Sequence, residues 1–301
     1  MQYGGWPNCR RISNGTVELV LTGDVGPRIM RYAFVDGDNI FAELPEQLGR
    51  AGESLWQPRG GHRIWIAPEL VPDTYALDNA PVRIDAGGDT VECVQPVEPE
   101  TGLEKRIRVR LDASGCGVEV THRIRNAGDK PRRFAPWALS MLAPGGVGIT
   151  GFPPRGTHPE NLPPTNPLVM WAFTDLSDSR WKFTRKYMLL GSDTSRRDPQ
   201  KLGHFNQNTW GAYVLGDSLF VKRYRADPSR DYPDFGCSFE MFSNDRVLEL
   251  ETLGPLEDVG PGESIEHVEH WTLKRGVRVS KWTDDELDRL FGASERQPFA
   301  G

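Results

Sequence analysis

The sequence predicts an all-β protein, a large antiparallel sandwich with few short helices, rather than a barrel or an alternating βαβ fold. Its 301 residues suffice to bury roughly three quarters of the surface that the unfolded chain exposes, so a large core can form. Short apolar segments recur between clusters of Gly, Asp, Asn or Pro, which is typical of strands joined by turns. The 32 glycines and 24 prolines leave little room for long helices.

Individual strands follow from apolar residues at every second position. Segment 118–125 is the clearest case, because its apolar residues and His122 share one face while polar residues occupy the other. His122 is therefore expected at the edge of the core. Further strands are expected at 16–22, 28–34, 82–84, 90–94 and 105–111, and in the later segments SLFVKRY, CSFEMF, RVLELETL and SIEHVEHWTL.

One short helix is expected near the end of the chain, over 283–291. Thr283 opens the segment TDDELDRLFG, and Glu286 follows three residues later, which is the spacing of a capping box. Gly292 fits the position just after the helix, where a left-handed residue commonly ends it.

Two stretches are expected to be irregular. Segment 143–168 carries seven prolines, which cannot donate to a sheet ladder, and 191–209 is similarly polar. Such loops either carry a binding function or only pack over a surface. No change of composition marks a linker, so we expect one β domain over 1–275 and a C-terminal extension, 276–301, that contains the helix.

Composition excludes several classes of partner. Charged residues make up 26% of the chain, the net charge is -6, and no basic stripe indicates nucleic acid. No apolar run has the length of a signal peptide or a membrane span, so a cytoplasmic protein is expected. The spacing of His62 and Glu69 fits no metal site, and no cofactor is expected. The four cysteines are too far apart to predict a zinc site or a disulfide framework: Cys9, Cys93, Cys116 and Cys237.

A pair of carboxylates is the first candidate for chemistry. In RVLELETL, alternation places Glu249 and Glu251 on one side of a strand, with Cα atoms about 7 Å apart. Each carboxylate raises the pKa of the other, so one of them can serve as a general base. The alternative is a solvated outer face with two glutamates that have no function.

The motif RGGHRIWIAPE, 59–69, is the second candidate. Its glycines allow close approach of the backbone, and the planar guanidinium of Arg63 can bridge two hydroxyls or hold an anion. Neighbours on a strand point to opposite faces, so only one of His62 and Arg63 can line a cleft unless a bulge intervenes.

Other polar and aromatic residues are candidates for ligand binding. Lys222 among acidic residues could hold an anionic ligand or could form a surface ion pair. Tryptophan rings can stack against the apolar face of a ligand, although most serve the core. The residues expected to bind substrate are Arg63, Trp65, Trp137, Lys222, Tyr232, Asp234, Glu240 and Glu249.

Over roughly residues 15–275 the chain resembles the galactose mutarotase-like superfamily, and most closely a little-characterised bacterial branch of it. The order of motifs carries the resemblance: GDVGPRIMRYAF, RGGHRIWIAPE, VTHRIRNAGDKPRRFAPWALSML, and the long segment from LFVKRYRADPSRDYPDFG to ELETLGPLEDVGPGESIEHVEHWTL. The resemblance implies a β-supersandwich whose concave face holds a sugar, and no nucleic acid or membrane as partner.

The resemblance also implies roles. In aldose 1-epimerases a glutamate on a late strand takes the proton of the anomeric hydroxyl, and Glu251 matches it, with Glu249 as substitute. Arg63 matches a sugar-contacting arginine. The family histidine that protonates the ring oxygen has no counterpart in FAPWALSML, where Trp137 and Ser140 stand. Since a positioned acid contributes a factor of about 10² to 10⁴, His62 is the expected replacement.

Three functions follow as hypotheses. The first is an epimerase-like sugar isomerase with Glu251 as base and His62 as acid. The second is a carbohydrate-binding or sensing protein that has lost the chemistry. The third is a lyase acting on a uronate, with Tyr232 as base. Nothing in the sequence indicates an oligomeric state.

Overall fold

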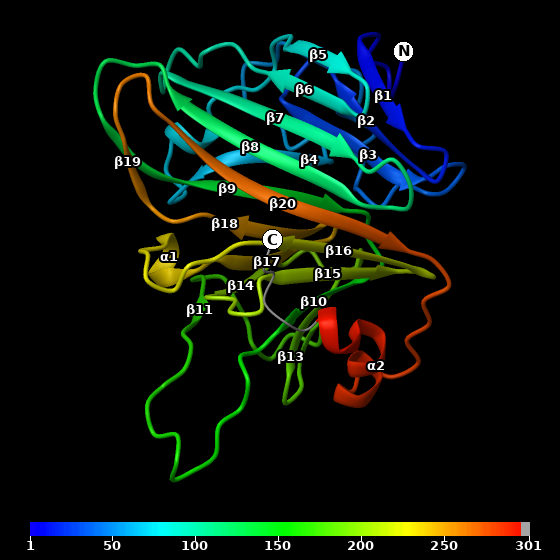
Figure 1. Cartoon of the computed structure of the whole chain (residues 1–301), viewed down its shortest axis with the longest axis vertical. Helices are drawn as coiled ribbons and strands as arrows, with labels where there is room; N and C mark the ends of the chain where they lie inside the picture. Colours follow the sequence, from blue (N-terminus) through cyan, green and yellow to red (C-terminus); the bar gives the residue numbers. More distant parts are fainter. Residues whose placement is uncertain (296–301) are drawn as a thin grey trace.

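Two ten-stranded antiparallel sheets face each other in the computed structural model, which describes residues 1–295 (Figure 1). The predicted all-β antiparallel architecture is confirmed. One sheet, the site sheet, has the order β1 (Cys9–Ser13), β2 (Val17–Thr22), β3 (Arg28–Phe34), β4 (His62–Ala67), β9 (Arg132–Leu142), β18 (Leu248–Leu253), β17 (Phe239–Ser243), β14 (Gln200–His204) and β11 (Leu168–Met170), and β19 (Glu257–Val259) also pairs with β9.

The other sheet, the cover sheet, packs its inner face against the site sheet. Its order is β12 (Trp181–Phe183), β13 (Tyr187–Gly191), β10 (Val147–Gly151), β15 (Trp210–Leu215), β16 (Ser218–Tyr224), β20 (Ser264–Lys274), β8 (Val118–Asn126), β7 (Leu103–Leu111), β6 (Thr90–Val94) and β5 (Arg83–Gly87). The main core lies between the sheets, where Leu19 and Tyr32 of the site sheet belong to one buried cluster with Val109 and Val120 of the cover sheet. His122 is fully buried there.

Within residues 1–295, helical structure is confined to three short segments: the 3-10 helix η1 (Asp73–Tyr75), α1 (Pro233–Gly236) and α2 (Asp284–Glu295). The helix predicted over 283–291 is α2, and Gly292 leaves the helical conformation at φ 62°. The predicted capping box is wrong in detail, because Glu286 accepts hydrogen bonds from the backbone of Ser280 and Lys281 rather than from Thr283. Among the described residues, no helix is long and apolar enough to span a membrane.

Each of the two stretches expected to be irregular contains a strand. Within 143–168 the chain forms β10, and within 191–209 it forms β14. The β14 segment QKLGH has little apolar character, but it lies between β17 and β11, and their backbones supply its ladder of hydrogen bonds. That tertiary pairing overrides the polar composition of the segment.

Candidate functional site

Three neighbouring strands of the site sheet give the molecule two different polar faces. Arg63 of β4, Leu139 of β9 and Glu251 of β18 stand on one rung of the sheet. Because side chains alternate along a strand, these three point away from the cover sheet, while His62 and Ser140, one residue along, point toward it.

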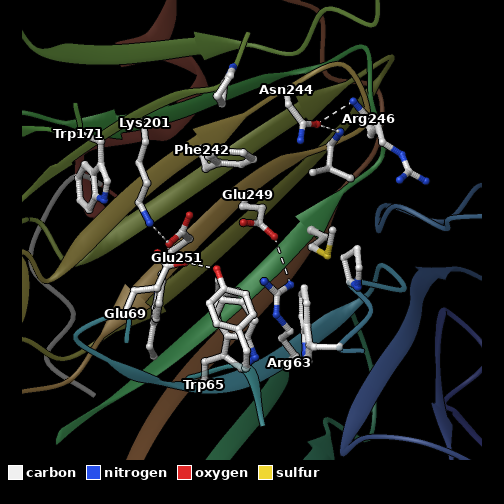
Figure 2. Close-up of a pocket in the computed structure, with 18 of the residues that line it drawn as sticks. Arg63, Trp65, Glu69, Trp171, Lys201, Phe242, Asn244, Arg246, Glu249 and Glu251 are labelled. Atoms are coloured by element: carbon white, nitrogen blue, oxygen red, sulfur yellow. Dashed lines mark hydrogen bonds and ion pairs between the residues drawn. The ribbon is translucent and has the colours of Figure 1, made fainter. Parts of the chain in front are cut away.

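The face that points away from the cover sheet forms the floor of a cavity of about 500 Å³, here called the outer cavity (Figure 2). Aromatic rings supply much of its lining, and charged groups of both signs reach into it. The aromatic residues include Trp56, Trp65, Tyr75, Trp137, Trp171 and Phe242, and the charged ones include Arg63, Glu69, Lys201, Arg246, Glu249 and Glu251.

One ion pair on the floor joins Arg63 to Glu249. The Arg63 Nη1 atom lies 3.2 Å from Glu249 Oε1, and the guanidinium carbon stands 4.3 Å from the ring centre of Trp65 and 5.2 Å from that of Trp56. Burial raises the pKa of Glu249, and Arg63 opposes that shift. The stacked guanidinium is thereby held in one orientation, with donors directed at a carboxylate.

A second ion pair joins Lys201 to two carboxylates. The ammonium lies 2.7 Å from Glu240 Oε2 and 2.9 Å from Glu251 Oε2, and 4.6 Å from the ring centres of both Trp137 and Trp171. Burial alone would lower the pKa of Lys201, but the two carboxylates raise it overall. Burial raises the pKa of Glu240, the deeper of the two. Lys201 is therefore a fixed cation.

Glu251 has one carboxylate oxygen that accepts hydrogen bonds and one that has no hydrogen-bond partner among the described residues. Its Oε2 atom accepts hydrogen bonds from Trp137 Nε1 and from Lys201 Nζ, each at 2.9 Å. Its Oε1 atom is buried and has no hydrogen-bond partner among the described residues. A buried acceptor without a donor is costly, so this oxygen is a natural place for the hydroxyl of a ligand.

The structure brings five of the sequence-predicted residues together in the outer cavity: Arg63, Trp65, Trp137, Glu249 and Glu251. Glu240, on β17, stands opposite Glu251 in the sheet and is fully buried against Lys201. Asp234 interacts with Glu240, and burial raises the pKa of its carboxyl group. Neither of these two expected residues belongs to the lining of the outer cavity.

His62 does not reach the outer cavity, so its expected role as the acid has no support in this placement. Its side chain is fully buried between the sheets, with Nε2 2.7 Å from His122 Nε2 and Nδ1 2.9 Å from Ser140 Oγ. The expectation for Lys222 is wrong for the same reason. Its ammonium is fully buried and lies 2.7 Å from Glu269 Oε1. We call these five residues the interior cluster: His62, His122, Ser140, Lys222 and Glu269.

The hydrogen bonds of the interior cluster form one directed chain. Lys222 can only donate, so Ser140 Oγ accepts from it at 3.1 Å. His122 Nδ1 must donate to the carbonyl oxygen of His267, at 2.9 Å. Burial lowers the pKa of both His62 and His122, which keeps them neutral. His62 then donates from Nε2 to His122 and accepts the Ser140 hydroxyl proton at Nδ1.

The interior cluster also contains the one group of potential metal ligands among the described residues. The ligand atoms of His62, His122 and Glu269 lie within 4.8 Å of one another. The donor set does not suit a cation, because the Lys222 ammonium occupies one carboxylate oxygen of Glu269, and Trp271 Nε1 donates to the other at 2.8 Å. A metal ion would have to displace a fully paired network beside a positive charge.

Tyr232 lies away from the outer cavity, and its expected role as a base toward a uronate has no support in this placement. The ring is 8% exposed and lines a separate groove. Its hydroxyl oxygen accepts a hydrogen bond from the backbone of Asp227 at 2.9 Å.

Solved structures resemble this molecule over nearly its whole length. The Slr1438 protein of Synechocystis sp. PCC 6803 matches with a TM-score of 0.60 at 12% identity, over 91% of this chain and 99% of that one. A galactose mutarotase-like protein of Lactobacillus casei ATCC 334 matches with a TM-score of 0.59 at 10% identity, over 89% and 100%. The chain has the galactose mutarotase-like fold. A candidate aldose 1-epimerase of Escherichia coli K12 matches this mutarotase-like fold with a TM-score of 0.52 at 13% identity, over 89% and 99%.

No protein-family model matches the sequence, and no curated protein does. The likeness to the mutarotase-like structures is therefore one of fold. It confirms the fold class that the order of sequence motifs predicted.

Several residues of the outer cavity were missed by sequence reasoning. Lys201 lies on β14, in a stretch expected to be a loop. Glu69 closes the quoted motif but was considered only as a metal ligand, and Tyr75 lies in η1, in a segment without periodicity. Trp56 and Trp171 carried no positional signal beyond their residue type.

Proposed function

We propose that this protein binds a sugar in the outer cavity and interconverts its anomers, with Glu251 as the general base. The observation that carries the proposal is the open oxygen of Glu251. Oε1 is buried, has no partner among the described residues, and belongs to a carboxylate that lines an aromatic cavity. A carboxylate held in this way can accept the proton of an anomeric hydroxyl.

The chemistry needs little movement of the protein. Lys201 and Trp137 fix Oε2 of Glu251, so Oε1 keeps one position while the sugar reacts. When Oε1 takes the proton from the anomeric hydroxyl, the electron pair of that O–H bond forms the carbonyl bond, the bond between the anomeric carbon and the ring oxygen breaks, and the ring oxygen takes a proton from a donor in the cavity. The open aldehyde then recloses on its other face and recovers the proton.

The walls of the cavity suit a sugar. Trp65 and Trp171 offer ring faces against which the C–H groups of a pyranose can stack. Arg63 has Nη1 directed at Glu249, and its planar group can bridge hydroxyls of a bound ring. Glu249 then orients that guanidinium and supplies a second acceptor.

One observation favours a second candidate function, sugar binding without chemistry. Among the described residues, no histidine lines the outer cavity, because His62 points between the sheets. The resemblance to mutarotases implies a histidine acid, and a cavity without one could bind a sugar and leave it unchanged.

The decisive experiment measures anomer equilibration by polarimetry and NMR. Freshly dissolved D-glucose, D-galactose, D-glucuronate and D-glucose 6-phosphate serve as probes. We expect the wild-type protein to accelerate at least one of them and Glu251→Gln to lower kcat by a factor of about 10² to 10⁴, with sugar-dependent thermal stabilisation retained. The matched control is Glu266→Gln, an exposed glutamate on β20.

The outcomes separate the two functions. Acceleration that persists in Glu251→Gln would remove Glu251 from the mechanism. Thermal stabilisation by a sugar without any acceleration would establish binding alone. Neither acceleration nor stabilisation at millimolar concentrations of any of the four sugars would contradict both functions.

A further inference from the structure

We propose that Tyr75 is the proton donor to the ring oxygen of the sugar, and that Glu69 orients its hydroxyl group. This inference rests on the proposed function and supplies the acid that His62 cannot provide. The observation that carries it is the composition of the cavity lining. Among the described residues that line the outer cavity, Tyr75 has the only hydroxyl group.

Tyr75 is held in place on two sides. Its ring packs against Trp65, with centres 5.1 Å apart, and against Trp56, with centres 5.6 Å apart. Its hydroxyl donates a hydrogen bond to Glu69 Oε1. Both Tyr75 and Glu69 line the outer cavity, and Figure 2 shows Glu69 on the same side of it as Glu251.

The segment that carries both residues is fixed to the site sheet. Thr74, fully buried, accepts a hydrogen bond from the backbone of Leu70 at 2.9 Å and donates to the carbonyl oxygen of Ile66 on β4 at 3.3 Å. Asp73 pairs with Arg132 at the start of β9. The phenol therefore keeps a defined position relative to β4, as a proton donor requires.

The other groups in the cavity are poorer donors. The Lys201 ammonium is committed to two carboxylates at 2.7 and 2.9 Å. The Arg63 guanidinium does not release a proton in proteins. Burial raises the pKa of Glu249, but Arg63 opposes that shift and already donates a hydrogen bond to its Oε1 atom.

The protonation state of Tyr75 suits the role. Burial and the Glu69 carboxylate raise the pKa of Tyr75 to about 12, so the phenol carries its proton at neutral pH. Arg63 and Lys201 act in the opposite direction. Their positive charges favour the phenolate at the moment when the proton leaves.

The step balances without a further reagent. Glu251 takes the proton of the anomeric hydroxyl, and the electron pair of that O–H bond forms the new carbonyl bond. The bond from the anomeric carbon to the ring oxygen breaks, and the ring oxygen takes the proton of Tyr75, whose hydroxyl turns from Glu69 to the bound sugar for this step. When the ring closes on the other face, the phenolate recovers its proton and Glu251 returns the other.

The experiment compares wild type, Tyr75→Phe and Glu69→Gln in the equilibration assay with the same four sugars. We expect Tyr75→Phe to lower kcat by a factor of about 10² to 10⁴ with KM nearly unchanged, because the ring still packs and only the donor is lost. Glu69→Gln keeps an acceptor for the hydroxyl group but removes the charge that raises the pKa of Tyr75, so we expect kcat to change, with its alkaline pH limit at lower pH and KM unchanged. Tyr232→Phe, in the separate groove, is the matched control.

Each outcome decides the matter. If the wild type accelerates equilibration and both variants keep its kcat, Tyr75 is not the donor. If Tyr75→Phe retains kcat while Glu249→Gln loses it, Glu249 holds that role instead. If Tyr75→Phe fails to fold, the kcat of Glu69→Gln decides. A wild type that accelerates none of the sugars overturns both this inference and the proposed function.

Discussion

Two charged clusters lie on opposite sides of the site sheet, and only one of them borders the outer cavity. On the outer face, Glu251 is bound by Lys201 but keeps Oε1 without a partner among the described residues. On the inner face, Glu269 has both oxygens engaged, by Lys222 and by Trp271. Charge and residue type do not distinguish the two clusters. They differ because Glu251 has a carboxylate oxygen without a hydrogen-bond partner among the described residues and lines a cavity.

The interior cluster also supports the floor of the outer cavity. Lys222 donates a hydrogen bond to the carbonyl oxygen of Leu250 at 3.1 Å. Leu250 stands between Glu249 and Glu251 on β18. Ser140, which accepts from the same ammonium, stands next to Leu139 on the cavity floor. The inner network thus ties the cover sheet to the strand that carries both carboxylates.

The largest expected effect comes from breaking the inner ion pair. Lys222→Met leaves the Glu269 carboxylate fully buried without its cation, and we expect the free energy of unfolding to fall by roughly 3 to 5 kcal/mol. Denaturant titration followed by circular dichroism measures this. Arg63→Met, at the outer pair, should cost much less stability, because Glu249 borders the cavity and water can replace the guanidinium.

The double variant Lys222→Met/Glu269→Leu is the control for this prediction. Removing both charges leaves no unpaired ion, so stability should return to near the wild-type value, apart from the donors of Thr252 and Trp271 that lose their acceptor. A single variant as stable as wild type would contradict the assignment of the inner pair as a structural element.

An intermediate effect is expected from pH. Burial holds the pKa of His62 and His122 below the ordinary value, that of His204 at about 4 and that of His267 at about 3. Below pH 6.5 these histidines bind protons in the unfolded chain but stay neutral in the folded protein. Their contribution therefore lowers the free energy of unfolding as the pH falls toward the pKa values of the folded state. Each histidine contributes up to about 1.4 kcal/mol per pH unit.

The measurement is the free energy of unfolding between pH 7 and 5, compared between wild type and variant because the raised pKa values of Glu240 and Glu249 affect both proteins alike. His122→Gln should reduce the slope of stability against pH by the equivalent of up to one proton. His158→Gln, in an exposed loop, is the matched control. Equal slopes in wild type and His122→Gln would show that His122 is not held neutral in the folded protein.

Alternation along strands made part of the site predictable. It placed Glu249 and Glu251 on one side of β18 and separated His62 from Arg63, as the structure has them. It could not tell which side faces a cavity, because every residue of both strands is buried. The burial of β4 comes from the cover sheet on one side and from the tryptophans of the cavity on the other.

Long-range partners account for what the sequence could not predict. The segment SLFVKRY alone allows Lys222 to be a surface residue, whereas in the structure Glu269 of β20 lies beside it. The local sequence predicts a loop at Lys201, whereas in the structure this residue lies on β14, which pairs with β17 and β11. In both cases the residue that neutralises the charge comes from another strand, and a local pattern does not contain it.

The smallest expected effect comes from replacing one tryptophan in each of the two clusters. Trp171 lines the outer cavity, is partly exposed and stacks on Lys201, whereas Trp271 is fully buried and donates to Glu269. Trp171→Phe should weaken sugar-dependent thermal stabilisation, with affinity lower by about 1 kcal/mol or less, because a smaller ring remains.

The matched variant is Trp271→Phe, which takes one donor from the Glu269 carboxylate. It should cost about 1 to 3 kcal/mol of stability and leave sugar affinity unchanged. The same substitution thus acts on binding at one face and on folding at the other. If Trp271→Phe weakened sugar binding as much as Trp171→Phe does, the two faces would be energetically coupled through β18. The coupling would then pass through the hydrogen bond from Lys222 to the carbonyl oxygen of Leu250.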